Sequence, residues 1–146
     1  ALAALLALAA PAGAAGFGPL GSFGSLGSGP GQVSAAEDIA VGPDGSAYVA
    51  DYQNYRVDVF GPDGSFSFAF GQQVNPKDGS DVCTSVSGCV AGERNGTAGA
   101  LGGPAGVAVG ADGTVFVSEY ENNRISAFSP GGKFLYAFGK GVAVAG

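Results

Sequence analysis

The chain contains no histidine, methionine or tryptophan among its 146 residues. Without histidine, most catalytic triads, histidine general bases and nearly all histidine-containing zinc sites are excluded. Basic residues are also scarce: Lys and Arg number 6 against 12 Asp and Glu, which gives a net charge of −6. Nucleic acids and anionic membranes are therefore not expected as partners, because both require clustered basic residues. Glycine is abundant, with 28 residues, but has no strict three-residue period, which excludes collagen.

Residues 1–14 begin with ten apolar residues and end in the small-x-small sequence Ala12-Gly13-Ala14. This pattern is typical of the apolar part of a secretory signal peptide and its cleavage site, although the usual basic stretch before it is missing. The alternative is an alanine-rich linker. Ten residues span only ~15 Å as a helix, about half of a bilayer core, so no membrane span is expected. The sequence thus predicts a secreted or extracytoplasmic protein.

An internal repeat is the most informative feature of the sequence. Residues 39–71 align without a gap with residues 107–139 at an offset of 68, and sixteen of the 33 aligned positions are identical. Each copy breaks into four short apolar runs separated by turn residues. Gly42-Pro43-Asp44-Gly45 and 61–64 are predicted hairpin turns, because proline presets φ and glycine accepts positive φ. Outside the signal region no window has a helical period, so the prediction is an all-β fold.

The last run of each copy has an aromatic residue at every second position. In 65–70 this pattern places Phe66, Phe68 and Phe70 on one face of a strand, and residues 133–138 repeat it. Strict alternation over six residues predicts a half-buried strand. Four antiparallel strands in ~35 residues, present twice, are typical of β-propeller blades.

The repeat resembles the NHL repeat. The resemblance rests on Ala-Val-x-x-Asp-Gly, then Tyr-Val-Ala-Asp-Tyr-x-Asn-x-Arg-Val-x-Val-Phe, then Asp-Gly-x-Phe and Phe-Gly, all read in the first copy. The second copy fits, except that Glu119 replaces the aspartate found at Asp51. Pro104 keeps the family's proline before the first strand, which the first copy lacks. Residues 23–32 are similar to the spacer that leads into such repeats.

This resemblance implies an incomplete β-propeller with two four-stranded blades. Four blades of ~40 residues, the minimum for a closed ring, need ~160 residues, and NHL propellers are typically six-bladed. The chain is therefore expected to be an N-terminal fragment whose partners include the remaining blades. The predicted units are a signal remnant (1–14), a Gly/Ser-rich spacer with a candidate strand of a neighbouring blade (15–35), blade 1 (36–71), an insert (72–103), blade 2 (104–139) and the start of the next linker (140–146).

Both cysteines, Cys83 and Cys89, lie in the insert, which is polar, rich in glycine and without alternation. The insert is predicted to be a long loop, and loops of this length are usually functional or disordered. Two cysteines in a secreted chain favour a disulfide; free thiols and a metal site are the alternatives, the last disfavoured because no other Cys or His supplies ligands. The bridge is expected to present a candidate recognition loop consisting of Thr84, Ser85, Val86 and Ser87.

Two further patterns in the insert are candidates for a calcium-binding loop and a glycosylation site. Asn75, Asp78 and Asp81 lack the residue order of a calcium loop and are interpreted as a solvated acidic turn. Asn95-Gly96-Thr97 is a glycosylation sequon, meaningful in a eukaryotic secretory pathway. No metal, cofactor or catalytic residue is assigned.

A trio of polar residues recurs in both copies: Asp51, Asn54 and Arg56 in blade 1, and Glu119, Asn122 and Arg124 in blade 2. We interpret them as structural. The acid accepts backbone N–H bonds at a turn, the asparagine adopts left-handed φ, and the arginine pairs with the acid across the turn. A catalytic acid–base pair is the alternative, but a site used once does not need to recur in every blade.

These observations favour a secreted, non-catalytic binding module that recognises a protein or glycan through its loops and propeller face. The alternative is a fragment of a six-bladed hydrolase or lyase whose metal and catalytic residues lie in other blades. RNA binding, known for some NHL propellers, is disfavoured because a basic aromatic face is lacking.

Overall fold

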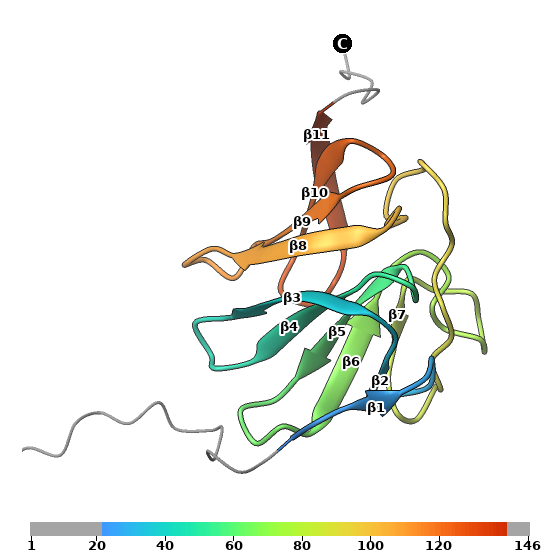
Figure 1. Ribbon diagram of the computed structural model, residues 1–146, viewed down its shortest axis with the longest axis vertical. Coiled ribbons are helices and arrows are strands. Elements are labelled where there is room, and N and C mark those ends of the chain that lie inside the picture. The colour runs from blue at the N-terminus through green and yellow to red at the C-terminus, as the bar shows by residue number, and fades with distance from the viewer. Residues whose placement is uncertain (1–21, 140–146) are drawn as a thin grey trace, which may run out of the picture.

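Two antiparallel sheets form where the two copies of the repeat lie in the sequence (Figure 1). The structure is a computed structural model, and it describes residues 22–139. The sheet of blade 1 has the order β3-β4-β5-β6-β7. Its strands are β3 Ala36–Val41, β4 Ala47–Asp51, β5 Arg56–Phe60, β6 Phe66–Phe70 and β7 Val82–Cys83.

Blade 2 repeats the four-stranded meander in the order β11-β10-β9-β8. Its strands are β8 Pro104–Val109, β9 Val115–Glu119, β10 Arg124–Phe128 and β11 Phe134–Gly139. Ahead of blade 1, the two-residue strands β1 Ser25–Leu26 and β2 Gln32–Val33 pair in parallel. Residues 22–139 contain no helix. The predicted all-β fold is confirmed: each copy of the repeat forms a four-stranded antiparallel meander, and the insert adds a fifth strand, β7, to the sheet of blade 1.

The hairpin turns form as the glycine positions predicted. Gly45 has a φ of 83° and Gly64 a φ of 78°, the left-handed region that favours glycine. In the first turn the Gly45 N–H donates to the Gly42 carbonyl at 3.0 Å, and Asp44 Oδ1 accepts from the Ser46 amide at 3.0 Å. The bonds from Ser46 hold the pKa of Asp44 below its usual value. Equivalent turns at 110–113 and 129–132 connect the strands of blade 2.

The predicted common face of Phe66, Phe68 and Phe70 is wrong. Phe68 pairs with Val59 and Phe66 with Phe60, and the register shifts between them. This β-bulge turns Phe66 to the face opposite Phe68 and Phe70, because neighbouring residues of a strand point to opposite faces. The last strand of blade 2 has a register shift at the same place. A bulge leaves no mark in an alternating sequence, so the pattern alone misplaced one phenylalanine in each blade.

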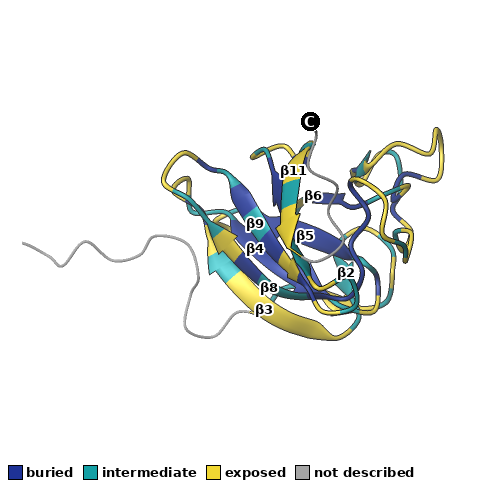
Figure 2. Cartoon of the chain, turned by 90° about the horizontal axis from the view of Figure 1, so that it is seen from above, coloured by how far each residue is buried: buried dark blue, intermediate teal, exposed yellow. Residues whose placement is uncertain are grey.

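The main core lies between the two blades. Buried residues from β4, β5 and β6 pack against buried residues from β8, β9 and β10, and the rings of Phe70 and Phe128 meet at a centroid distance of 4.9 Å. Strand β8 lies beside β3 and β4, and Asp38 Oδ2 accepts from the Val107 amide at 2.9 Å. Figure 2 shows β4 and β5 buried along their length and β3 mostly exposed. The largest cluster of buried apolar residues in the described part of the chain therefore lies between the blades.

Phe23 packs on Phe60 of blade 1 in the same way that Phe70, a blade 1 residue, packs on Phe128 of blade 2. The Phe23 and Phe60 ring centroids lie 4.7 Å apart, and Phe128 is the counterpart of Phe60 at the offset of 68. A Cβ on Gly64 would meet Phe23 just as one on Gly132 would meet Phe70. Part of the spacer thus covers blade 1 in the way that blade 1 covers blade 2. Whether the spacer also supplies a strand to a neighbouring blade stays a prediction, and the signal remnant (1–14) and the start of the next linker (140–146) lie outside the described residues.

Candidate functional site

Each recurring trio forms a cluster that we call a clasp: Asp51, Asn54 and Arg56 form the blade 1 clasp, and Glu119, Asn122 and Arg124 the blade 2 clasp. In both blades the acid ends one central strand and the arginine begins the next. Strand pairing places the two directly opposite each other. The intervening turn carries the asparagine back toward the acid.

The blade 2 clasp gathers its contacts around Glu119, which is buried. Arg124 Nε donates to Glu119 Oε1 at 2.8 Å, and Asn122 Nδ2 and Ser126 Oγ donate to the same carboxylate. Gly102 N–H donates to Glu119 Oε2 at 3.0 Å. The Arg124 guanidinium also donates to three backbone carbonyls, those of Gly96, Thr97 and Ala100. The side chains thereby fix the loop that leads into blade 2.

The blade 1 clasp does the same with a different set of acids. Arg56 is fully buried, and its Nε donates to Asp58 Oδ2 at 2.9 Å while lying 4.0 Å from Asp51 Oδ2. Asn54 Nδ2 donates to Asp51 Oδ2 at 2.6 Å, and the Ser34 amide donates to Asp51 Oδ1 at 2.9 Å. The Arg56 guanidinium also donates to four carbonyls, at 2.6 to 3.1 Å: those of Ser28, Gly29, Gln32 and Val90.

Asp58, which the sequence analysis did not select, belongs to this clasp. Its side chain is fully buried. Desolvation raises the pKa of Asp58 to about 7, and the neighbouring Arg56 only partly opposes that rise. Desolvation also raises the pKa of Asp51. The blade 1 clasp therefore buries two carboxyl groups, those of Asp51 and Asp58, beside the single guanidinium of Arg56.

The two clasps bind equivalent carbonyls. The acceptors of Arg124 at 96, 97 and 100 each lie 68 residues after acceptors of Arg56 at 28, 29 and 32. The structural repeat therefore begins about a dozen residues before the repeat visible in the sequence. Sequence comparison missed this because a carbonyl acceptor does not require any particular side chain. The signal in the sequence that marks this longer repeat is a glycine with positive φ at the same offset, Gly31 with φ 71° and Gly99 with φ 87°.

The structural interpretation of the trio needs one correction. Asn54 and Asn122 do not occupy the left-handed region. The residues with positive φ are Tyr55, at 50°, and Asn123, at 51°. The two asparagines instead use their Nδ2 groups to bridge the acid and a loop carbonyl: Asn54 donates to Gly27 O and Asn122 to Asn95 O.

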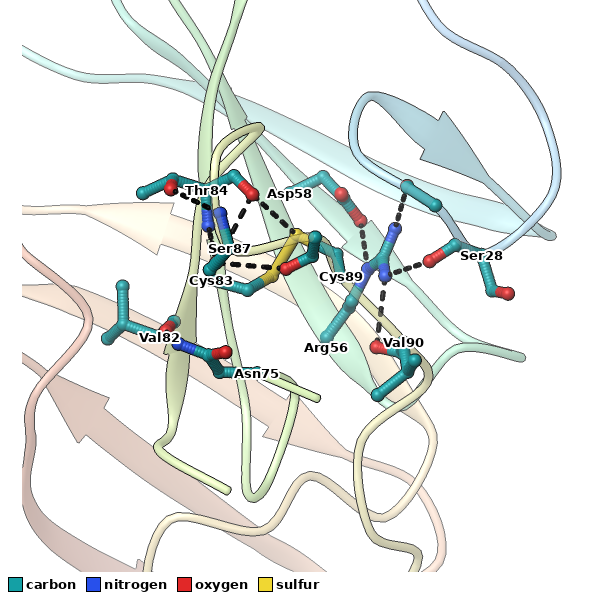
Figure 3. Close-up of a disulfide and its surroundings, with 12 residues drawn as sticks. Ser28, Arg56, Asp58, Asn75, Val82, Cys83, Thr84, Ser87, Cys89 and Val90 are labelled. Carbon is teal, nitrogen blue, oxygen red and sulfur yellow. Dashed lines mark hydrogen bonds and ion pairs between the residues drawn. A yellow bond between two sulfur atoms is a disulfide. The ribbon is translucent and has the colours of Figure 1, made fainter. Parts of the chain in front are cut away.

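The predicted disulfide between Cys83 and Cys89 is present, with both residues buried (Figure 3). The sequence predicts the insert as a long loop, but the insert also contains a strand. This strand, β7, pairs with β6 through Ala69–Cys83 and Phe70–Val82. The disulfide packs with Ala69 and Val74 in a small apolar cluster. Directly after the ring, Val90 O accepts from Arg56 Nη1 at 3.0 Å. The insert is thus attached to blade 1 at its outer edge and at the clasp.

The candidate recognition loop is the tip of a tight hairpin, in which Thr84 and Gly88 form an isolated bridge. Thr84, Ser85 and Val86 are exposed, and Ser87 is half-buried. Ser87 Oγ accepts from the Thr84 amide at 2.8 Å, and Lys77 Nζ donates to the Val86 carbonyl at 2.6 Å. The apolar Val86 side chain is 83% exposed. The loop is therefore held in one conformation with an apolar residue at its tip.

A second exposed surface lies on the face of blade 2 that points away from blade 1. Phe116, Ile125, Tyr136 and Phe138 are the counterparts, at the offset of 68, of blade 1 residues that blade 2 covers. Tyr136 is 51% and Phe138 49% exposed. A shallow pocket of about 400 Å³ opens beside Ile125 and Phe138. A larger pocket of about 510 Å³ lies on blade 1 between Phe23, Ile39 and Phe60.

Within residues 22–139, no group of three or more acidic or cysteine side chains gathers to hold a metal ion. That part of the chain also has no helix long and apolar enough to cross a membrane. At the sequon, Asn95 Nδ2 donates to Gln72 Oε1 at 2.8 Å, and Asn95 Oδ1 accepts from Thr97. Both partners lie in the insert, so the sequon side chains join the C-terminal part of the insert to its first residue.

Comparison with known proteins adds one match. Residues 101–128, which contain the blade 2 clasp, match the family model of the NHL repeat. No curated protein matches the chain.

Proposed function

Because this chain carries an NHL repeat, a repeat of β-propeller interaction modules, we propose that it is an extracytoplasmic, non-catalytic binding module for a protein or glycan. The observation that carries this proposal is the disulfide hairpin of the insert. Thr84, Ser85 and Val86 at its tip are exposed, while Cys83 and Cys89 at its base are buried. A binding loop that is already ordered loses less conformational entropy when it meets its partner.

The disulfide agrees with an oxidising compartment outside the cytoplasm. Export is testable directly. If residues 1–14 are a signal remnant, mass spectrometry of the exported protein will find a mature N-terminus near Ala15. Recovery of the exported protein with 1–14 attached would overturn this part of the proposal.

Recognition by the hairpin is tested by screening the chain on a glycan array and against a displayed peptide library. Val86→Asp and Thr84→Ala should each weaken the binding of a genuine ligand, because both alter the exposed tip and leave the buried base intact. Ser65→Ala, in an exposed turn of blade 1, is the matched control and should bind as the unmodified chain does. Ligands that bind all variants equally would argue against the hairpin as the recognition element.

We further propose that the exposed apolar face of blade 2 is covered by a further blade. Its residues are counterparts of those that blade 2 covers on blade 1, so a blade of the same kind fits it. The chain on its own should then associate, as measured by light scattering, and Phe138→Lys should reduce association. Ser65→Lys is the control, because that residue is exposed in a turn of blade 1 and belongs neither to this face nor to the hairpin tip. A monomer with one sharp thermal transition would contradict the proposal.

A further inference from the structure

The two clasps differ at one pair of positions in a chemically informative way. In blade 2, Ser126 supplies a hydroxyl that donates to Glu119, and Ser126 aligns with Asp58 at the offset of 68. Glu119 aligns with Asp51. Blade 1 therefore places a second carboxyl group where blade 2 places a hydroxyl donor.

The shorter aspartate explains why Arg56 turns to this second acid. Glu119 reaches Arg124 Nε at 2.8 Å, whereas Asp51 stays 4.0 Å from Arg56 Nε. Asp58 Oδ2 fills the gap at 2.9 Å. The other oxygen, Asp58 Oδ1, is buried and has no hydrogen-bond partner if both carboxyl groups are ionised. A buried oxygen without a partner is costly, and the Ser126 geometry shows which bond is missing.

We propose that Asp58 keeps a proton up to near-neutral pH and donates it from Oδ1 to Asp51, so that in blade 1 a proton supplies the bond that the Ser126 hydroxyl supplies in blade 2. A protonated carboxyl is an O–H donor, which makes Asp58 the functional equivalent of Ser126. The arrangement then holds one guanidinium, one carboxylate and one neutral acid.

Within residues 22–139, the hydrogen bonds and ion pairs of this cluster bring no further charged side chain to the two acids. Strands β4 and β5 contribute Asp51, Arg56 and Asp58. The leading loop, 27–34, contains no titratable side chain and contributes carbonyls and the Ser34 amide. Strand β6 contributes Ala69 opposite Asp58, and the insert contributes the Val90 carbonyl and the neutral disulfide.

The proton couples pH to the attachment of two segments. Burial raises the pKa of Asp58 from 3.8 to about 7, so the folded chain binds this proton more tightly than the unfolded chain. The stabilisation is complete below pH 3.8 and is lost as pH rises through about 7. Above that pH Asp51 and Asp58 are both ionised and repel each other. The hydrogen bonds of the clasp to the leading loop and to the Val90 carbonyl therefore weaken.

The test is carboxyl-carbon NMR of the full chain labelled with ¹³C-aspartate, with each carbon assigned through its own backbone. The Asp58 carbon should titrate near pH 7. The hydrogen-exchange protection of the Ser34 amide should fall about tenfold between pH 6 and 8, the change expected for one linked proton with this pKa. The Gly102 amide, which donates to Glu119 in blade 2, is the internal control and should keep its protection.

Two variants complete the test. Asp58→Asn keeps the shape and offers a permanent N–H donor, so it should remove the pH dependence at Ser34. Asp112→Asn, in an exposed turn, should leave the dependence unchanged. If the carbons of both Asp51 and Asp58 titrate below about pH 5, as ordinary aspartates do, the proposal is wrong. Equal loss of protection at Ser34 and Gly102 would also overturn it.

Discussion

Replacing either clasp arginine by alanine should destabilise the fold, and the loss should be larger in blade 1. Arg124→Ala removes bonds to one carboxylate and three carbonyls, of which Gly96 and Thr97 belong to exposed residues that water can reach. Glu119 keeps its bonds from Asn122 and Ser126. We expect a loss of about 1–3 kcal/mol of unfolding free energy, because charged hydrogen bonds are exchanged partly for bonds to water.

Arg56→Ala has a more severe effect because Arg56, Asp51 and Asp58 are all fully buried. It removes the partner of two acids and of four carbonyls, and water cannot replace it without opening the loop. Removal of one member of a buried charge pair typically costs about 3–5 kcal/mol. The same loss is expected here, accompanied by release of the leading loop and of the insert at Val90.

Urea unfolding followed by far-UV circular dichroism measures both losses. Arg94→Ala is the matched control: its ion pair with Glu121 is exposed, so removing it should change stability little. Equal losses for Arg56→Ala and Arg124→Ala would refute the reasoning from burial. Unchanged stability together with lost ligand binding would move Arg124 from the structural cluster into a binding site.

Two further outcomes are expected. Replacing Cys83 and Cys89 together by serine should lower the free energy of unfolding by roughly 2–2.5 kcal/mol, the loop-entropy estimate for so small a ring. The hairpin should become more mobile while the far-UV circular dichroism spectrum stays the same. Rapid thiol labelling of the untreated protein would show that no bridge forms. Gly132→Ala should lower the melting temperature, because its Cβ would lie 2.5 Å from Phe70 Cβ and the residue has a φ of 82°. Gly131→Ala is the control and should leave the melting temperature unchanged, because its Cβ would meet nothing within 4 Å. Similar melting temperatures for the two variants would contradict the close packing of the blades.

The repeat, the hairpin turns and the disulfide were predictable because each depends on residue type. A left-handed turn selects glycine, a half-buried strand alternates, and a bridge needs two cysteines. The bulge that reverses Phe66 was not predictable, since an extra residue changes the direction of a side chain without changing the composition. The leading loops were missed for a related reason: the arginines bind carbonyls, which every residue has. Asp58 was overlooked because it aligns with Ser126, and the chemical equivalence of the two becomes visible only once the hydrogen bonds are known.

The position of the insert has a consequence for engineering. The insert leaves blade 1 after Gly71, where one structural repeat ends, and reaches Asn95, where the loop held by the blade 2 clasp begins. The hairpin tip, 84–87, lies between these points and contributes neither to strand β7 nor to the carbonyls that the arginines bind, which include that of Val90. The junction between consecutive repeats is thus a natural grafting site, and a peptide of choice can replace the hairpin tip while both clasps keep their native loops.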